Sequence, residues 1–386
     1  MDNAATTAVS RQVLEKMLPY FTDVYGNASS IHGTGRDARK ALEESRRQVA
    51  SVLNCKPQEI YFTSGGSESD NWAIKGVAFA NRRKGGHIIT SAIEHHAVLH
   101  TCQWLEKQGF TVTYLPVDEF GQVDPRDVEA AITDKTVLIS VMAANNEIGT
   151  IQPIREIAQI ARAHQVYFHT DAVQAMGAIP MDVQEIGCDM LSLSAHKFHG
   201  PKGVGALYIR QGVRIDNFMH GGAQERGKRA TTENIPGIVG LAEALKLATR
   251  DLEEKSARIA ALRDQLIDGL TAIPYTRLNG HRTNRLPNNC NISIRFVEGE
   301  ALLLRLDLAG IAASSGSACT SGSLDPSHVL LAIGLPHEIA HGSLRFSLSD
   351  ATTQEEVDTV LSTLPGIVET LRSMSPLYAD FMEAQI

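Results

Sequence analysis

The stretch Met190-Leu191-Ser192-Leu193-Ser194-Ala195-His196-Lys197-Phe198-His199-Gly200-Pro201-Lys202-Gly203 places a lysine between a buried run and a turn. The short apolar run Met190 to Leu193 is typical of a buried strand, and Gly200-Pro201 favours a turn. Most lysines are solvated surface charges. A lysine that directly follows a buried strand is expected to be desolvated, and desolvation favours the neutral, nucleophilic form of its amine. Lys197 is therefore a candidate covalent anchor for a cofactor.

Helical patterns and short apolar runs alternate on both sides of this stretch, from about residue 36 to 260. Three segments have a helical pattern: Arg36 to Leu53, Ser67 to Ala80 and Ile154 to His164. Further segments are typical of buried strands: Glu59 to Thr63, His87 to Thr90, Thr111 to Val117, Val137 to Ala143, Val166 to His169, Met190 to Leu193 and Gly203 to Ile209. The alternation predicts an α/β protein with a mostly parallel sheet that is covered on both faces.

The pattern changes after a long helical stretch from about Gly237 to Ala272. Two strands and two helices are predicted beyond it: Cys290 to Phe296, Ser343 to Leu348, Glu300 to Leu308 and Gln354 to Arg372. They indicate a smaller α+β domain. We expect residues 13–257 to form the large domain, and residues 1–12 together with 258–386 to form the small one.

Charge and cysteine usage limit the classes of function. The 386 residues carry 36 basic against 44 acidic side chains and no lysine-arginine block, so neither nucleic acid nor a membrane is an expected partner. The five cysteines are scattered and include no C-x-x-C pair, which argues against a zinc site or a disulfide framework. Without a charged-then-apolar leader or a stretch of about 20 apolar residues, we expect a cytoplasmic protein with reduced thiols.

Two glycines separate a predicted strand from a predicted helix in Phe62-Thr63-Ser64-Gly65-Gly66-Ser67-Glu68-Ser69-Asp70. Glycines let the backbone approach a phosphate, and the free N–H groups of a first helical turn point toward an anion. Gly66 and Ser67 are thus candidate phosphate ligands. The alternative is that Ser67 and Glu68 only cap the helix.

Asp171 follows the predicted strand Val166 to His169, at the carboxyl edge where parallel sheets bind ligands. A carboxylate there can hold a pyridine nitrogen protonated, which turns the ring into an electron sink. Gln174 could donate to a phenolic oxygen of such a ring. Asp171 could instead form a turn. Ser194 and His196 offer donors for a phosphate, or else satisfy backbone groups at the strand end.

Glu94-His95-His96 follows the predicted strand His87 to Thr90, so one imidazole can face the same sheet edge and stack on a flat ring. Paired histidines also occur at metal sites. Adjacent side chains point apart, and no third ligand is evident nearby. A plain structural histidine is the remaining alternative.

Cys319 lies in Ser314-Ser315-Gly316-Ser317-Ala318-Cys319-Thr320-Ser321-Gly322-Ser323, a run of small residues without apolar periodicity. Buried structural cysteines normally have apolar neighbours. The segment therefore predicts an exposed, mobile thiol that reacts as a thiolate. Arg345, in a predicted strand of the second domain, is a candidate clamp for an amino-acid carboxylate, with a surface salt bridge as the alternative. A Schiff-base lysine, a carboxylate for a pyridinium nitrogen and a mobile thiol together indicate sulfur chemistry on pyridoxal phosphate.

With these residues in view, the chain resembles the cysteine desulfurases, pyridoxal-phosphate enzymes of the class V aminotransferase superfamily. The resemblance runs nearly end to end and implies an aspartate-aminotransferase-like fold (fold type I), with a mostly parallel central sheet and a smaller α+β domain. Besides the Asp171 and Lys197 segments, the matching motifs are Asp2-Asn3-Ala4-Ala5-Thr6-Thr7, Thr63-Ser64-Gly65-Gly66-Ser67-Glu68-Ser69, Asn145-Asn146-Glu147-Ile148-Gly149-Thr150 and Gly221-Gly222-Ala223-Gln224-Glu225-Arg226.

The resemblance implies a role for each matching position. Lys197 anchors the coenzyme covalently, Asp171 pairs with its pyridine nitrogen, and His95 stacks over the ring. Gln174 meets the phenolic oxygen, while Asn146 and Arg345 position the substrate and its carboxylate, with Asn146 also beside the coenzyme. The implied phosphate ligands are Gly66, Ser67, Ser194, His196 and, from the second subunit of a homodimer, Thr232.

The implied reaction is removal of sulfur from L-cysteine. Lys197 removes the Cα proton, and the Cys319 thiolate then attacks the substrate sulfur. Carbon–sulfur cleavage leaves alanine, and Cys319 keeps a persulfide for an iron-sulfur scaffold protein or a thiolation enzyme. The segment around Cys319 is similar to the longer cysteine loop of the class that serves scaffold proteins. Some family members also place a cluster iron on this sulfur, so transient iron-sulfur ligation by Cys319 is a further implication.

Two positions depart from the family pattern. Thr231 stands immediately before Thr232 where the family more often has glycine, and very few residues precede Asp2-Asn3-Ala4. Two alternative functions also remain from the sequence. One is a class V transaminase or selenocysteine lyase, in which Cys319 is incidental. The other is a non-catalytic protein that binds a scaffold partner; the presence of Lys197, Asp171 and His95 argues against it.

Overall fold

A seven-stranded sheet organises the larger part of the chain in the computed structural model, which describes residues 1–315 and 326–385. The strand order is β1-β7-β6-β5-β4-β2-β3; β7 pairs antiparallel with both of its neighbours, and the other pairs are parallel. The mostly parallel α/β sheet predicted from the sequence is confirmed. The strands are β1 (Ile60–Thr63), β2 (His87–Ser91), β3 (Thr111–Leu115), β4 (Thr136–Ser140), β5 (Tyr167–Asp171), β6 (Met190–Ser194) and β7 (Gly205–Ile209).

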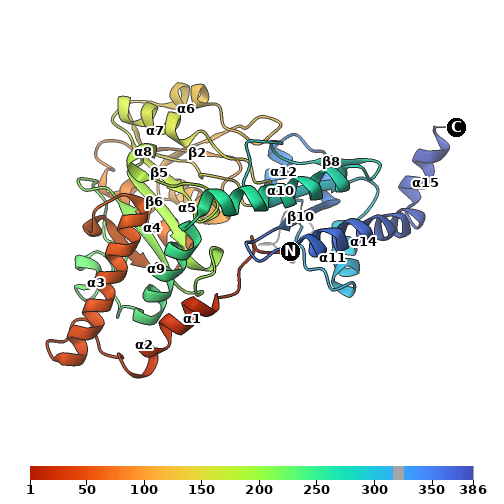
Figure 1. Ribbon diagram of the computed structural model, residues 1–386. Helices are drawn as coiled ribbons and strands as arrows, with labels where there is room; N and C mark the ends of the chain where they lie inside the picture. Colours follow the sequence, from red (N-terminus) through yellow and green to blue (C-terminus); the bar gives the residue numbers. More distant parts are fainter. Residues whose placement is uncertain (316–325, 386) are drawn as a thin grey trace.

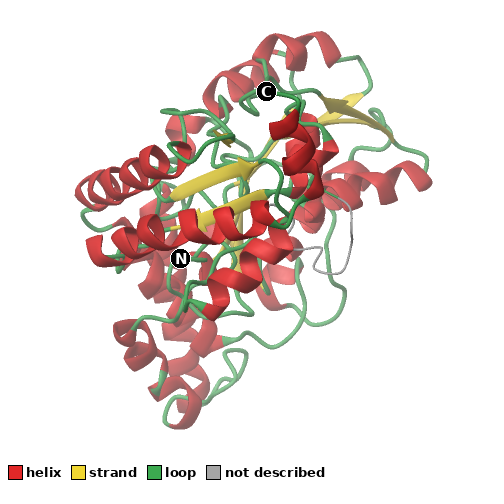
Figure 2. Cartoon of the chain, turned by 90° about the vertical axis from the view of Figure 1, so that its right-hand side faces the viewer, coloured by secondary structure: helices red, strands yellow, loops and turns green. Residues whose placement is uncertain are grey.

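Helices lie on both sides of this sheet (Figures 1 and 2). Successive side chains of a strand point to opposite faces. Ile60 and Phe62 of β1 accordingly join the buried cluster that includes α3 (Gly33–Leu53) and α9 (Ile235–Thr249). Tyr61 joins the cluster that includes α4 (Gly66–Ala80) and α5 (His96–Lys107). The helices are α1 (Arg11–Met17), α2 (Pro19–Thr22), α3 (Gly33–Leu53), α4 (Gly66–Ala80), α5 (His96–Lys107), α6 (Pro125–Ala131), α7 (Ile154–Ala163), α8 (Val183–Ile186) and α9 (Ile235–Thr249), with short 3-10 turns η1 (Pro57–Glu59), η2 (Ala195–Lys197) and η3 (Gln224–Gly227).

A second sheet has three antiparallel strands in the order β10-β9-β8. Its buried cluster includes Ile292 and Phe346 from the strands and Leu266 and Leu364 from two covering helices. No helix in the described ranges is long and apolar enough to cross a lipid bilayer. The elements of this part are α10 (Leu252–Thr271), β8 (Thr276–Leu278), β9 (Asn289–Ile294), α11 (Gly299–Leu308), α12 (His328–Ala332), α13 (His337–His341), β10 (Ser343–Ser347), α14 (Gln354–Ser373) and α15 (Pro376–Glu383).

The first residues of the chain join the smaller sheet. Asp2 forms a parallel bridge with Ser347, and the N–H of Ser347 donates to the carbonyl of Met1 at 2.8 Å. The chain then turns back toward α1 and α2 below the larger sheet (Figure 1). The segment that follows Asp2 therefore passes between the two sheets, where it reaches the end of β6.

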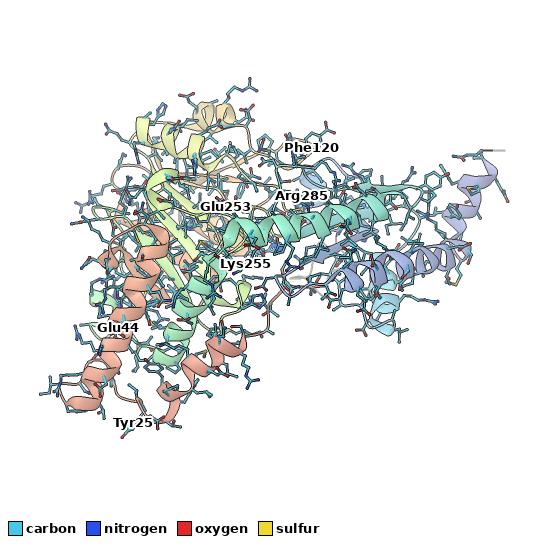
Figure 3. The ribbon with its side chains drawn as sticks, viewed as in Figure 1. Tyr25, Glu44, Phe120, Glu253, Lys255 and Arg285 are labelled. Carbon is cyan, nitrogen blue, oxygen red and sulfur yellow. The ribbon has the colours of Figure 1, made fainter. Side chains whose placement is uncertain are left out.

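The predicted helical stretch from Gly237 to Ala272 is two helices. Helix α9 ends at Thr249, and Asp251 has a left-handed φ of 55°, so the chain turns before α10 begins at Leu252. Aspartate is one of the few residues that tolerate this conformation. Helix α10 then leads from Glu253 and Lys255 toward the smaller sheet (Figure 3). The predicted boundary at residue 257 falls inside α10, and the domain division stays a prediction.

Candidate active site

The carboxyl ends of β1, β5 and β6 meet at one edge of the larger sheet. Thr63 of β1 and Ser194 of β6 both pair with Gly205 of β7, and Asp171 of β5 pairs with Ser192 of β6. A Cβ at Gly205 would lie 2.7 Å from the Cα of Gly65, so only glycine allows the turn after β1 to approach this closely. The close approach brings the start of α4 beside the residues that follow β6.

Lys197 lies in the turn η2 and points to the amino-terminal segment. Its Nζ donates to the carbonyl oxygens of Ala4 at 2.6 Å and Ala5 at 2.9 Å. Gln174 Nε2 donates to the same Ala4 oxygen at 3.0 Å. Lys197 and Gln174 also line one cavity of about 70 Å³. The structure thus brings these two predicted residues together, and Ala4 connects them.

Asp171 is buried at the end of β5, and one of its carboxylate oxygens accepts a hydrogen bond from the N–H of Val173 at 2.9 Å. Burial raises the pKa of Asp171 to about 6, against the opposing effects of that hydrogen bond and of the Lys197 charge. Asp171 is therefore within electrostatic reach of Lys197. Asp171 ends β5, and its bond to the Val173 N–H also forms an Asx turn, so the turn-forming alternative is compatible with the structure as well.

His95 is the N-cap residue of α5, where its Nδ1 accepts a hydrogen bond from the N–H of Ala97 at 3.1 Å. Burial, together with the nearby charge of Lys197, lowers the pKa of His95 to about 4. The ring is therefore neutral at physiological pH. Within the described residues no group of three or more His, Cys, Asp or Glu could hold a metal ion.

Helix α4 starts at Gly66, and its N-cap residue Gly65 has no side chain to cap the first N–H groups. A Cβ at Gly66 would lie 2.6 Å from Cγ2 of Val173, so glycine keeps the backbone open at this point. Ser67 is exposed in the first turn, and Ser194 lies beside Gly66. Of the alternative in which Ser67 and Glu68 cap the helix, one contact is present: Glu68 accepts the N–H of Ser64 at 2.8 Å, just before the N-cap residue Gly65.

His196 and Thr6 connect the phosphate candidates to the amino-terminal segment. His196 Nδ1 lies 3.1 Å from Thr6 Oγ1, and Thr7 Oγ1 donates to the His196 carbonyl at 2.9 Å. Burial lowers the pKa of His196 to about 4, and the charges of Lys197 and Lys202 act in the same direction. His196 is therefore a neutral hydrogen-bonding group at physiological pH.

Arg345 of β10 is 3% exposed; the alternative of a salt bridge is met by an ion pair with Asp2, but this pair is largely buried and not on the surface. Its guanidinium donates to the Asn146 carbonyl at 3.0 Å and to Asp2 Oδ1 at 3.2 Å. Its Nε is buried and has no hydrogen-bond partner among the described residues. A planar guanidinium with an unused donor beside Asn146 suits a carboxylate ligand.

The loop that carries Thr232 is anchored by two ion pairs. Glu225 forms two hydrogen bonds of 2.8 Å with the buried Arg46 guanidinium and accepts the Phe62 N–H at 3.0 Å. Arg229 binds Glu68, in the first turn of α4, at 2.7 and 3.0 Å. Thr232 is exposed, and with Ser64 it lines a pocket of about 140 Å³.

Thr231 has a φ of 105°, a backbone conformation that suits glycine and strains a β-branched residue by about 1–3 kcal/mol. Thr231→Gly is therefore expected to raise the free energy of unfolding by about 1 kcal/mol, after the greater entropy of glycine in the unfolded chain is subtracted. Urea unfolding of the coenzyme-free protein measures the change. The matched control is Thr232→Gly, where φ is not positive and a loss of stability is expected. A loss in both variants would contradict the strain at Thr231.

Cys319 lies outside the described residues. The other four cysteines are buried or half-buried. Burial raises the pKa of the Cys55, Cys102 and Cys290 thiols to about 12 and raises that of Cys188 as well. None of these four thiols is a thiolate near neutral pH.

Sequence reasoning missed three buried titratable residues beneath the site: Asp70, Glu94 and His169. Asp70 and Ile74 share one face of α4, since they are four residues apart. That spacing places a carboxyl on the apolar side of the helix and could have identified Asp70. Glu94 and His169 gave no comparable signal, because a loop and a short strand have no extended periodicity.

The comparisons with known proteins agree with this geometry. A family model described as aminotransferase class-V matches residues 1–360. Cysteine desulfurase IscS of Methanosarcina thermophila is 62% identical over 377 residues, which cover 98% of this chain and 93% of that protein. A solved NifS-like protein is 42% identical with a TM-score of 0.91, covering 96% of this chain and 98% of its own. A solved SspA in complex with cysteine is 38% identical with a TM-score of 0.80, covering 91% and 99%.

The fold, the edge of the sheet and these matches define the class: the chain belongs to the aminotransferase class-V family. The chain is also similar over nearly its whole length to proteins named as cysteine desulfurases. Within that family the chain belongs to the cysteine desulfurases.

Proposed function

We propose that this protein uses pyridoxal 5'-phosphate to remove sulfur from L-cysteine, releases L-alanine and passes the sulfur to an acceptor for iron-sulfur cluster assembly or other sulfur-containing products. The main structural support is that Lys197 and Asp171 lie at the same edge of the sheet. Lys197 follows β6, Asp171 ends the neighbouring β5, and the two are close enough for the lysine charge to lower the carboxyl pKa. A nucleophilic amine and a carboxylate at one sheet edge are the two groups that this coenzyme requires.

The residues at the edge fit the coenzyme. The start of α4 offers N–H groups without a side-chain cap, and Gly66 leaves space that a Cβ would fill. That cradle suits a phosphate, to which Ser67, Ser194 and His196 would add polar groups. When bound, pyridoxal phosphate supplies an electron sink for negative charge that develops at the substrate Cα.

The chain's own groups would hold and orient the coenzyme and move protons. Lys197 Nζ would form the covalent attachment and, once released from it, would take the Cα proton. Asp171 would hold the pyridine N–H, and Gln174 would donate to the phenolic oxygen. His95 is neutral, so it can stack on the ring without adding a positive charge.

The substrate and its sulfur need further groups. Arg345 Nε, which has no hydrogen-bond partner among the described residues, would donate to the cysteine carboxylate beside Asn146. Cys319 is proposed to attack the substrate sulfur: the Cys319 S–S bond forms, the carbon–sulfur bond breaks, and its electron pair passes to the carbon that becomes the alanine methyl group. The raised pKa values of the other thiols favour Cys319 for this step.

Several features of the assembly belong to the same proposal. A second copy of the chain would place its Thr232 on the coenzyme phosphate, which makes a homodimer the functional unit. The sulfur acceptor would be an iron-sulfur scaffold protein or a thiolation enzyme, and the Cys319 persulfide would be able to hold a cluster iron transiently. We keep the cytoplasmic location and the division into residues 13–257 and the remainder as parts of this proposal.

The products decide between the proposed function and its alternatives. Protein supplied with pyridoxal phosphate, L-cysteine and a reductant is expected to yield alanine and sulfide in equal amounts. A requirement for a keto acid would identify a transaminase instead. Turnover of L-selenocysteine with none of L-cysteine would identify a selenocysteine lyase, and the absence of any product would support a non-catalytic binding protein.

A further inference from the structure

A second carboxyl group lies beneath Asp171. Asp70 projects from α4 toward the sheet and is 1% exposed. The charge of Asp171 acts on the Asp70 carboxyl and raises its pKa, and the charge of Glu94 acts in the same direction. Three buried carboxyl groups, of Asp70, Asp171 and Glu94, therefore interact electrostatically.

The polar partners of Asp70 are few. The Ser192 hydroxyl hydrogen-bonds its carboxyl, and Oδ1 has no hydrogen-bond partner among the described residues. The nearest basic group is the His169 ring, whose Nε2 lies 3.7 Å from Oδ1, which is too far for a hydrogen bond. An ionised carboxylate with one hydroxyl donor and no bonded cation is costly in a buried site.

His169 does not supply the missing positive charge. Its ring is 0% exposed and lies between two hydroxyls, with Ser140 Oγ 2.9 Å from Nδ1 and Ser192 Oγ 2.9 Å from Nε2. If the Ser192 hydrogen points to Asp70, Ser192 must accept from Nε2–H, and Nδ1 must accept from Ser140. One neutral tautomer of His169 satisfies all of these hydrogen bonds. Burial also lowers the pKa of His169 to about 3.

Glu94 is the third acid, and it is held separately. Its Oε1 accepts the Ser91 hydroxyl at 2.6 Å and the Met142 N–H at 2.9 Å, and burial raises its pKa to about 8. Among the described residues, the Lys197 cation acts on the Asp171 carboxyl and not on the Asp70 carboxyl.

We propose that Asp70 is a neutral carboxylic acid at physiological pH, and that its proton limits the buried carboxyl pair of Asp70 and Asp171 to a single negative charge. Asp70 is then a positioning residue, which acts through Asp171 and the α4 helix. Its role toward the coenzyme rests on the proposed function, because only there does Asp171 face a protonated ring nitrogen. The protonation of Asp70 does not rest on the proposed function, because Asp70 is buried in the chain without the coenzyme.

The decisive test is infrared spectroscopy of the coenzyme-free protein at neutral pH, since a protonated carboxyl has a C=O stretch that a carboxylate lacks. Labelling with ¹³C-aspartate separates Asp70 from Glu94 and other glutamates. We expect a labelled protonated-carboxyl band in the parent protein that is absent in Asp70→Asn. The control Glu94→Gln should keep that band. A parent protein without the band would overturn the proposal, and that outcome does not depend on whether Asp70→Asn folds.

Stability against pH gives a second readout that a merely structural role would not produce. The pKa of Asp70 is raised well above 3.8 in the folded chain, so its contribution to stability is fully present below about pH 4 and is lost as the pH rises. Asparagine does not titrate, and it has the shape of the neutral acid. Asp70→Asn should therefore gain melting temperature relative to the parent, more at about pH 9 than at about pH 6.

The outcomes separate this proposal from the proposed function. An equal loss of melting temperature at every pH would mean that Asp70 is an ionised partner of His169, and the proposal would be wrong even if the enzyme releases sulfur from cysteine. If the band and the pH dependence are found but L-cysteine is not turned over, the proposed function fails and the protonation of Asp70 stands.

Discussion

Lys197→Ala is expected to lower alanine release from L-cysteine by at least about 10³-fold, because one amine serves as both coenzyme anchor and base. The visible absorption band of the covalently held coenzyme should disappear in the same variant. Lys197 is placed for both roles by the end of β6 and by its hydrogen bonds to the Ala4 and Ala5 carbonyls. Steady-state alanine assays and absorption spectra measure the two effects.

Lys202→Ala is the matched control, since Lys202 is an exposed lysine in the same loop. It should keep both the absorption band and the activity. The melting temperature of coenzyme-free Lys197→Ala shows whether the amino-terminal segment still packs without the lysine. A folded Lys197→Ala protein that retains the visible band would mean that another amine holds the coenzyme.

Cys319→Ser is expected to reduce sulfide production by at least about 100-fold, because a serine hydroxyl cannot take up sulfur as a persulfide does. The visible band should remain, since Cys319 has no part in holding the coenzyme. Loss of activity with loss of the band in Lys197→Ala, but with the band retained in Cys319→Ser, would separate coenzyme attachment from sulfur transfer. Methylene-blue detection of sulfide and absorption spectra provide the readouts.

Cys55→Ser is the control for this second prediction. Cys55 is half-buried, and burial raises the pKa of its thiol to about 12, so it should not carry sulfur. Sulfide production in Cys55→Ser should equal that of the parent. If Cys319→Ser makes sulfide at the parent rate, the persulfide role of Cys319 is wrong and the transaminase and lyase alternatives gain support.

Most of the larger sheet could be predicted because its strands are apolar on both faces and alternate with helices. The predicted run Met190 to Leu193 is β6, and the predicted run Val166 to His169 is most of β5. The break between α9 and α10 could not be predicted, because Asp251 takes a left-handed φ inside a sequence with continuous helical periodicity. The short β8 was missed, since three residues give no pattern.

The placement of the site followed from one rule: ligands of parallel sheets bind at the carboxyl ends of strands. That rule put Asp171, Lys197 and His95 at one edge. It could not predict that the Ala4 carbonyl accepts from both Lys197 and Gln174, because backbone carbonyls leave no mark in a sequence. It also missed Asp70, whose neighbours become visible only when α4 packs on β5 and β6.

The most direct measurement is mass spectrometry of the coenzyme-loaded protein after one equivalent of L-cysteine, without reductant. Digestion then locates any bound sulfur, and amino-acid analysis counts the alanine. Our account predicts one extra sulfur atom on the peptide that contains Cys319, with one alanine released for each sulfur bound. Alanine without protein-bound sulfur, or sulfur on a different cysteine, would contradict it.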